Sequence, residues 1–278
     1  MRGLAVYIST CDGYSDCWNP FFRLFERYWP DFSGTLYLST EYKEYAYGNL
    51  PVVSQRLCWS HGVPTSERVP WSRFTRWALE AVPDDLVLFL QEDFFLKGTV
   101  RSEVVDRYAV LMREHPDIRC LHLTDQSVQC GGPSEFPGLD EVPLRQRYRV
   151  SCQCALWRKD EILSILRDDE SAWEYEEFGS ARSAALGHRY LAVSHDVVRL
   201  GVYEIVPYVF TGIVQGQWLP EVQPLFEANG VVVDYTVRGF HEGRRRKPFL
   251  DRVRYHLHRL VKKVRNEYDI RVHLERVA

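Results

Sequence analysis

The sequence predicts an α/β fold with a mostly parallel central sheet flanked by helices. Short apolar, β-prone segments alternate along the chain with segments of helical periodicity, as in sheets whose strands are joined by helices. One segment, Leu86–Leu90, is apolar at every position, which is typical of a strand near the centre of a sheet and covered on both faces. The chain has 278 residues, of which 45% are hydrophobic and 14% aromatic, enough for a substantial core.

The first elements follow from local residue types. The dipeptide Asn19-Pro20 predicts a helix start, because asparagine caps helices and proline fits the first helical position. A second helix is predicted from its periodic aromatic and alanine residues. The predicted elements are strands at Leu4–Ser9, Thr35–Thr40 and Val52–Gln55, with the second helix at Ser72–Val82.

The middle of the chain continues the alternation, with a strand at Asp85–Asp93, a helix at Thr99–His115 and a strand at Ile118–Leu123. Gly216–Gly239 predicts a capped helix followed by a strand, as architecture rather than chemistry. The 7 cysteines form no CxxC pair, so we expect free core thiols. Cys152 and Cys154 alternate with Gln153 in an apparent strand and are expected to face the same side.

The charge pattern divides the chain at residue 240. Residues 241–278 carry 12 Lys and Arg against 5 Asp and Glu, whereas residues 1–240 carry 23 against 33. We therefore expect a main domain at 1–240 and a basic amphipathic helical tail at 241–278. The tail helix either packs its apolar stripe on the body with a solvated basic face, or lies on an anionic membrane surface. Nucleic acid is not expected as a partner, because the basic cluster lacks a binding motif.

Two adjacent acids interrupt apolar sequence at the end of the central strand. Ligands of such sheets bind beyond the carboxyl ends of the strands, so Gln91, Glu92 and Asp93 are expected at the binding edge. If the strand continues, Gln91 and Asp93 share one side and Glu92 points to the other. The acids either hold a divalent cation on a diphosphate or form ion pairs with Arg73 or Arg76.

Three aromatic-rich segments together resemble a known family. They are STCDGYSDCWNPFFRLFERYWPDFSGTLYLSTE, WSRFTRWALEAVPDDLVLFLQEDFFL and SAWEYEEFGSARS, within roughly the first two-thirds of the chain. In this order they are similar to bacterial GT-A-type glycosyltransferases of capsule and lipopolysaccharide biosynthesis. The resemblance implies a GT-A-like, Rossmann-like fold that binds a nucleotide-sugar donor on one half and a glycan or glycolipid acceptor on the other. It also implies transfer of a hexosyl unit.

The resemblance assigns donor-binding residues to two strand ends. Gln91-Glu92-Asp93 takes the place of the family's DxD motif, and Asp93 is the implied metal ligand and a catalytic residue, because its metal would stabilise the charge on the leaving diphosphate. Because Gln91 replaces the first acid, affinity for Mn²⁺ or Mg²⁺ should fall, and metal dependence is open. Thr10 and Asp12 take the place that contacts the base and ribose, although a turn made by Asp12 with Gly13 explains them equally. The assignment depends on Asp93 facing an open edge of the sheet.

Arg73 is the implied donor-side residue that meets the diphosphate, although a surface arginine is the simpler expectation.

A second site is implied on the acceptor side. Glu174, Glu176 and Glu177 are each suited by type to remove the acceptor proton, and Glu176 matches the resembled pattern best. Trp173 is the implied platform for an acceptor sugar. An acidic first turn that favours the helix dipole would explain the same acids without catalysis, and inverting or retaining stereochemistry is left open.

Two other functions compete with sugar transfer. A nucleotidyltransferase would also use strand-end acids, but the chain contains neither GxxxxGK nor GxGxxG. A non-catalytic protein that binds nucleotide-sugars or carbohydrate is the second alternative, and the loss of the first acid favours it. Because no apolar run approaches the roughly 20 residues of a membrane span, we expect a cytoplasmic protein, with the tail providing peripheral contact at the inner face of the cytoplasmic membrane.

Overall fold

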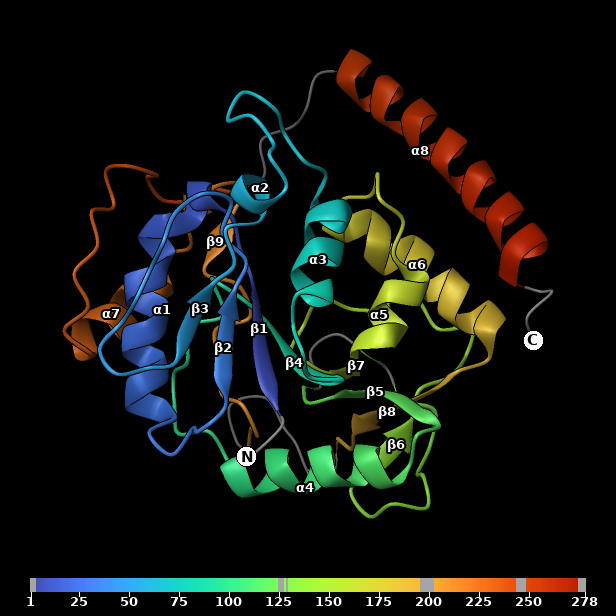
Figure 1. Cartoon of the computed structure of the whole chain (residues 1–278), viewed down its shortest axis with the longest axis horizontal. Coiled ribbons are helices and arrows are strands. Elements are labelled where there is room, and N and C mark those ends of the chain that lie inside the picture. Colours follow the sequence, from blue (N-terminus) through green and yellow to red (C-terminus); the bar gives the residue numbers. More distant parts are fainter. Residues whose placement is uncertain (1–3, 125–127, 129, 196–202, 244–248, 275–278) are drawn as a thin grey trace.

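The computed structural model describes residues 4–124, 128, 130–195, 203–243 and 249–274, with the backbone alone for 249–257 and 273–274. An eight-stranded sheet lies at its centre, with helices against both faces (Figure 1). The strands are β1 (Ala5–Ser9), β2 (Thr35–Leu38), β3 (Val52–Ser54), β4 (Leu86–Gln91), β5 (Ile118–His122), β6 (Leu139–Glu141), β7 (Ala155–Arg158) and β8 (Arg189–Val193), and a separate hairpin holds β9 (Ile213–Val214) and β10 (Gln217–Trp218). The helices are η1 (Asp12–Tyr14), α1 (Ser15–Tyr28), α2 (Leu57–Ser60), α3 (Trp71–Glu80), α4 (Ser102–Glu114), α5 (Lys159–Ile165), α6 (Ala172–Leu186), α7 (Val222–Ala228), α8 (Phe249–Asp269) and η2 (Ile270–Leu274).

The order of the strands confirms a mostly parallel sheet. The order is β3-β2-β1-β4-β7-β5-β8-β6. Strands β1 to β4 are parallel, and β5 is parallel to β8. Strand β7 is inserted antiparallel between β4 and β5, and β6 closes the edge antiparallel to β8. The carboxyl ends of the parallel strands therefore meet at one edge, together with the start of β7.

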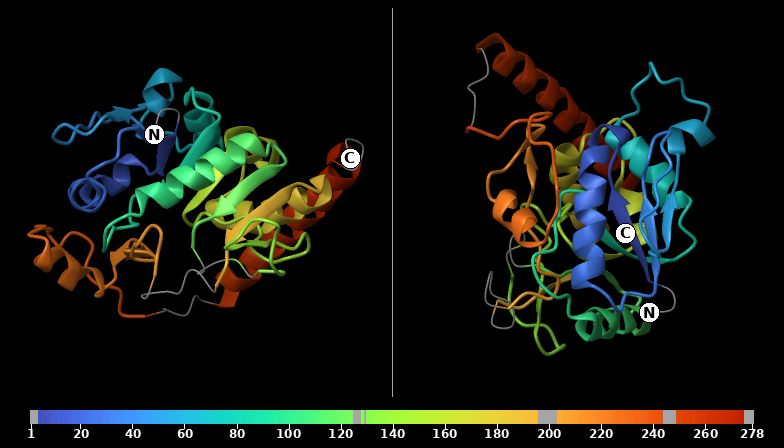
Figure 2. Two further views of the ribbon diagram at one scale, coloured as in Figure 1. Left: turned by 90° about the horizontal axis from the view of Figure 1, so that it is seen from below. Right: turned by 90° about the vertical axis from the view of Figure 1, so that its left-hand side faces the viewer.

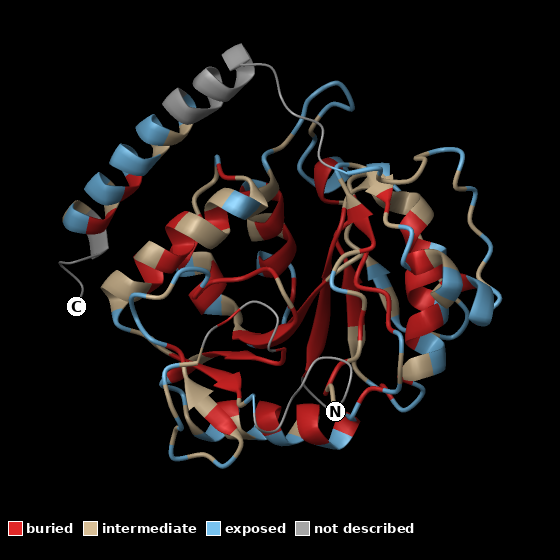
Figure 3. Ribbon diagram, turned by 180° about the vertical axis from the view of Figure 1, so that it is seen from behind, coloured by how far each residue is buried: buried red, intermediate tan, exposed pale blue. Residues whose placement is uncertain are grey.

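Two apolar layers cover the sheet, as the sequence predicts for β4. Leu86, Leu88 and Leu90 pack with α1 and α4, whereas Val87 and Phe89 pack with α3 and α5 on the opposite face. Figure 3 shows the buried sheet between these layers, and Figure 2 shows the helices on either side of it. Strand β4 lies between β1 and β7, so its carboxyl end is central in the binding edge.

The predicted start of the first helix at Asn19-Pro20 is wrong. Helix α1 begins at Ser15, so Pro20 lies inside it. The η1 turn, closed by a bond from the Tyr14 N–H to the Cys11 carbonyl, leads directly into the helix. Pro20 removes one hydrogen bond within the helix, but it is buried beside the aromatic stripe of α1. Tertiary packing therefore outweighs the local signal, and Asn19 accepts a hydrogen bond from Tyr45 Oη at 2.8 Å instead of capping.

The segment after the hairpin is partly as predicted. Helix α7 forms and ends at Asn229-Gly230, where Gly230 adopts a positive φ of 60°. The strand predicted beyond it is absent from the described residues 231–239, where Val232 is 95% exposed. An Asp234 turn that accepts from the Thr236 N–H reverses the chain instead.

The two neighbouring cysteines face opposite layers, contrary to the prediction. Cys152 packs on the α3 side of the sheet, and Cys154 packs on the α1 side. The chain bends through residues 152–154 and becomes a strand only at Ala155, so the alternation of a strand does not apply. None of the seven cysteines, all of which lie in described segments, is in a disulfide bond; five are buried, as predicted, whereas Cys11 and Cys130 are partly exposed.

The tail forms the predicted helix α8, which lies along α6 (Figures 1 and 2). The packed-helix prediction places the apolar stripe of this helix against the body. The structure instead places its polar side there. Asn266 is 5% exposed, whereas Val261 and Val264 are 68% and 63% exposed. We call this contact the α8 seam; it joins Arg259, Lys262, Arg265, Asn266 and Asp269 of α8 to Arg167, Asp169, Glu174, Glu177 and Arg182.

The acidity of the body explains this orientation. Glu174 and Glu177 on α6, with Asp169 before it, present carboxylates where α8 lies, and the cations of α8 turn toward them. Within the described residues, no helix combines the length and apolar character needed to cross a bilayer.

Candidate active site

The carboxyl edge of β1 and β4 gathers the polar residues that the sequence singles out. Ser9 lies opposite Gln91, and Phe89 lies opposite Ala155 at the start of β7. The segment before β7 therefore reaches the same edge as Gln91 and Glu92. This edge is where open α/β sheets bind ligands.

Asp93 does not face this edge openly, which corrects the expectation on which its donor-binding and metal-binding roles depend. The residue is 6% exposed. Its Oδ2 accepts hydrogen bonds from Thr211 Oγ1 at 2.6 Å and from the N–H groups of Gly212 and Ile213 at 3.1 Å each. Burial raises the pKa of Asp93, while these donors act to lower it. Asp93 thus anchors the loop before β9.

The early end of β4 accounts for this placement. The strand ends at Gln91, and a turn follows in which the Phe94 N–H donates to the Gln91 carbonyl at 3.1 Å. The alternation predicted for Gln91 and Asp93 therefore does not apply. The turn inserts Phe94 and Phe95 into the core, and Gly212 packs so closely that a Cβ there would lie 2.3 Å from the Phe95 ring.

Glu92 is the acid of this segment that remains partly exposed at the edge. Its N–H donates to the Ser9 carbonyl at 3.3 Å, which holds it beside the end of β1. Burial of the carboxyl, and then the neighbouring Asp93, raise the pKa of Glu92 well above its usual value of 4.5. Arg238 partly offsets this, but its guanidinium is bound to Asp16 at 2.6 and 2.5 Å. Among the described residues, none forms an ion pair with Glu92.

The arginines of α3 do not neutralise the acid segment. Arg76 Nε donates to Asp168 at 2.8 Å, and Arg73 Nε lies 3.7 Å from the same carboxylate. The ion-pair interpretation of Glu92 and Asp93 is therefore wrong. The Arg73 side chain is 46% exposed in the first turn of α3, so it is accessible to a ligand.

Thr10 and Asp12 hold the loops of the edge together. The Thr10 N–H donates to Ser39 Oγ at 3.0 Å, and Thr10 Oγ1 accepts from the Trp18 indole at 2.9 Å. Asp12 accepts from the N–H groups of residues 41, 42 and 43 at 2.9 to 3.1 Å, so it binds the loop after β2 rather than forming a turn with Gly13.

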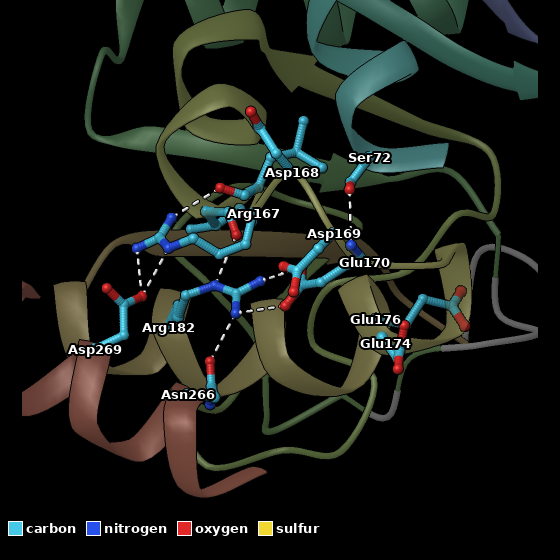
Figure 4. Close-up of polar contacts among 12 residues, drawn as sticks. Ser72, Arg167, Asp168, Asp169, Glu170, Glu174, Glu176, Arg182, Asn266 and Asp269 are labelled. Carbon is cyan, nitrogen blue, oxygen red and sulfur yellow. Dashed lines mark hydrogen bonds and ion pairs between the residues drawn. The ribbon is translucent and has the colours of Figure 1, made fainter. Parts of the chain in front are cut away.

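The three acids of α6 have different partners; Figure 4 shows Glu174 and Glu176 on this helix. Glu174 completes a capping box with Ser171 and pairs with Lys262 at 2.8 Å. Burial opposes ionisation of Glu174, but the bonds from Lys262 and Ser171 lower its pKa overall. Glu177 binds Arg259 through both oxygens. These two acids therefore belong to the α8 seam.

Glu176 lies apart from the seam and points toward the segment before β7. Its Oε1 accepts from the Cys152 N–H at 2.8 Å and from Ser151 Oγ at 3.4 Å. No cation contacts its carboxylate among the described residues. Burial raises the pKa of Glu176, and the two hydrogen bonds lower it. A carboxylate with a raised pKa is a stronger base than a solvated one, which suits it to accept a proton.

Two tryptophans differ in their relation to the sheet edge. Trp173 is 79% exposed at the start of α6. Trp71, by contrast, donates from its indole to Ser9 Oγ at 3.3 Å and packs on the Tyr175 ring at a centroid distance of 5.4 Å. It is partly buried and links the end of β1 to the turn of α6 that carries Glu176. Its position at a helix start, after Pro70, is the sequence signal that could have identified it.

The protein residues alone do not build a metal site at this edge. Across the described ranges, no group of three or more His, Cys, Asp or Glu side chains could hold a metal ion. Gln91 carries no charge, and one oxygen of Asp93 is occupied by three donors. Glu92 is the carboxylate that fits a divalent cation, which would also need oxygens from a bound diphosphate.

The sequence matches no protein-family model and no curated protein sequence. Among solved structures, TarS 1-349 from S. aureus in complex with UDP is 13% identical over 86% of this chain and 68% of that chain, with a TM-score of 0.46. In another TarS 1-349 structure the match covers 58% of that chain, and in a longer TarS structure 41%.

Two further structures have similar or lower scores. Mannosyl-3-phosphoglycerate synthase from Rubrobacter xylanophilus is 10% identical over 66% of this chain and 72% of that chain, with a TM-score of 0.36. CMP:2-keto-3-deoxy-manno-octonic acid synthetase complexed with CTP is 11% identical over 83% and 98%, with a TM-score of 0.43. Likenesses this weak carry no inference about substrate or reaction.

Proposed function

We propose that this chain is a glycosyltransferase that moves a sugar from a nucleoside-diphosphate donor to a hydroxyl of a glycan or glycolipid acceptor. The donor would occupy the carboxyl edge of β1 and β4, and the acceptor would lie toward α6. The observation that carries the proposal is Glu176, a half-buried carboxylate with a raised pKa that no described cation neutralises. The sequence resemblance to GT-A enzymes of bacterial capsule and lipopolysaccharide pathways supports the same function.

The proposed reaction is a single displacement at the anomeric carbon. The acceptor oxygen forms a bond to that carbon while Glu176 takes the hydroxyl proton, and the bond to the diphosphate oxygen breaks. The nucleoside diphosphate leaves with the bonding electrons. The bonds from Cys152 and Ser151 to Oε1 hold the Glu176 carboxylate in one orientation.

Other residues of the edge would bind the donor. Arg73 is the accessible cation for the developing charge on the diphosphate. Glu92 would hold a Mn²⁺ or Mg²⁺ ion together with donor phosphates, and such an ion would supply charge stabilisation at the leaving group. Trp71, whose ring is tilted against that of Tyr175, offers an aromatic face for a sugar ring, and Trp173 would extend the acceptor surface.

Donor binding and catalysis can be tested separately. A thermal-shift screen of nucleoside diphosphates, with and without Mn²⁺, should raise the Tm for one base. The purified chain should then release nucleoside diphosphate from the matching nucleotide-sugar. Glu176→Gln should abolish release and keep the thermal shift, whereas Glu177→Gln, a neighbouring seam acid, should keep both.

The sealed position of Asp93 favours a second candidate, a non-catalytic protein that binds nucleotide-sugars. In that case the thermal shift would persist, but no nucleoside diphosphate would be released by wild type. If Glu176→Gln still releases nucleoside diphosphate, Glu176 is not the catalytic base.

An NMR spectrum of the product anomer would distinguish inversion from retention.

A further inference from the structure

Helix α8 presents an apolar face that no described part of the body covers. Leu260, Val261, Val264 and Tyr268 are 58%, 68%, 63% and 64% exposed. Their spacing places them on one side of the helix. Residues two apart point about 200° apart, so Val264 lies opposite the buried Asn266. In Figure 3 the described part of α8 is mostly exposed, in contrast to the sheet.

The α8 seam keeps this face turned outward. Arg259 and Lys262 form ion pairs with Glu177 and Glu174 at 2.6 and 2.8 Å. Asn266 Oδ1 accepts from Arg182 at 2.6 Å at a fully buried position (Figure 4). Turning the apolar residues inward would place them against carboxylates and leave Arg182 without this acceptor. The exposed face is therefore a consequence of how α8 is attached.

Basic side chains flank the apolar face. The Arg265 side chain is 74% exposed although it meets Asp169, and Lys263 and Arg271 are also exposed. In the sequence, the run RRRK at 244–247 is separated by one residue from the first residue of the helix, whose apolar spacing begins at its first turns. Pairing α8 with a second copy would bring these rows of positive charge together. An anionic lipid surface satisfies both the apolar face and its basic borders.

We propose that the outer face of α8 binds the surface of an anionic membrane, with the helix lying in the plane of the interface. This inference stands independently of the proposed sugar transfer. One consequence does rest on that function. Helix α6 carries seam residues Glu174 and Glu177 beside Glu176, so a membrane-bound α8 would hold the acceptor side of the site close to the bilayer.

The test is sedimentation of the full chain with vesicles. Vesicles of phosphatidylcholine with phosphatidylglycerol should bind the chain, and vesicles of phosphatidylcholine alone should bind it much more weakly. Val261→Asp with Val264→Asp should weaken binding about tenfold or more, because it removes apolar area and adds negative charge. The matched control is Val232→Asp with Val237→Asp, two valines that are 95% and 71% exposed elsewhere, and it should bind as wild type does.

Three results would overturn the proposal. The first is equal binding of wild type and the Val261/Val264 variant, which would mean that the outer face of α8 is not the surface that binds the vesicles. The second is equal binding to neutral and anionic vesicles. The third is a wild-type dimer in analytical ultracentrifugation that the variant converts to a monomer, since that would identify a second copy as the occupant. Circular dichroism should show unchanged helix content in both variants, and release of nucleoside diphosphate without vesicles should be unaffected.

Discussion

The central sheet and the α8 seam are held by opposite kinds of interaction. Strand β4 is buried by apolar side chains on both faces, from Leu86 to Leu90. The seam consists of ion pairs and hydrogen bonds, most of them partly exposed, such as Arg259 with Glu177 at side-chain exposures of 41% and 38%. Apolar burial scales with area and is little affected by salt, whereas exposed ion pairs contribute little each and are screened.

From this difference we expect the central sheet to be rigid and helix α8 to open by itself. Local opening has a low free energy where few buried apolar contacts must be broken. The sheet positions Glu92 and Ser9, so the candidate site is built on the rigid part. We therefore expect helix α8 to adapt to a surface without moving Glu92 and Ser9. Five predictions test this contrast, in order of decreasing effect.

The largest effect is expected at the buried exception within the seam. Arg182 and Glu170 are 1% and 4% exposed and form a two-bond ion pair beside Asn266 (Figure 4). Arg182→Met should lower the free energy of unfolding by about 3–5 kcal/mol, because Glu170 is left buried without a partner. Urea denaturation measures this. Adding Glu170→Met should recover most of the loss, and an equal loss in the double variant would contradict the explanation.

Truncation within β4 should have the next largest effect. Leu88 is fully buried, and Leu88→Ala should cost about 3 kcal/mol through lost burial and the cavity left behind. The control is Val110→Ala at a position that is 47% exposed on α4, with an expected change within about 0.5 kcal/mol. Similar urea midpoints for both variants would argue against the sheet as the rigid part.

Glu92→Gln should have a smaller effect of opposite sign. Because the folded-state pKa of Glu92 is raised, the folded protein keeps a proton that the unfolded chain has released. Wild-type stability should therefore fall as the pH rises from about 4.5 toward the raised pKa. Glutamine has no carboxyl group to titrate. The free energy of unfolding of the variant should therefore match that of wild type at about pH 4 and exceed it at about pH 8.

Denaturant midpoints across this range give the measurement. If the difference in stability between wild type and the variant does not change with pH, the folded surroundings of Glu92 do not disfavour its ionised carboxylate.

Loss of a single seam hydrogen bond should open α8 locally. Asn266→Ala removes the acceptor of Arg182 and should lower the opening free energy of α8 by about 1 kcal/mol. Hydrogen exchange should become faster at α8 amides and stay unchanged in β1 and β4. Faster exchange in those strands would mean that α8 and the sheet open together.

The smallest effect is expected at the exposed pair of the seam. Glu177→Gln weakens the pair with Arg259 and should change stability by at most about 0.5 kcal/mol, because both side chains are solvated. Thermal denaturation should give a small difference from wild type in low salt and a smaller one in high salt, because salt screens the exposed pair. A loss as large as that of Leu88→Ala would contradict the weak-seam description.

The main elements of the fold were predictable because their signals are local. Most of the predicted strands and helices, including the unbroken apolar run of β4, correspond to real elements whose ends lie within three residues of the predicted ones. The start of α1 was not predictable, because Pro20 lies inside the helix among buried aromatic residues that its neighbours in sequence do not reveal. The antiparallel insertion of β7 also depends on pairing between distant segments.

The candidate site was predictable in place but not in detail. Gln91 and Glu92 lie at the predicted edge, beside the end of β1. The role of Asp93 depends on Thr211 and Gly212, more than a hundred residues away. Glu176 differs from Glu174 and Glu177 because α8 supplies cations to those two alone among the described contacts.

Periodicity and residue type act over short distances, so the sequence alone predicts most of the strands and helices and the segments that carry charge. Only the tertiary structure decided where each charge points: Asp93 inward to a loop, Glu176 toward the sheet edge, and the cations of α8 toward the body. The physical reason is that a carboxylate or cation is stabilised by whichever partner the folded chain brings within a few ångströms, and that partner is set by packing across the whole molecule.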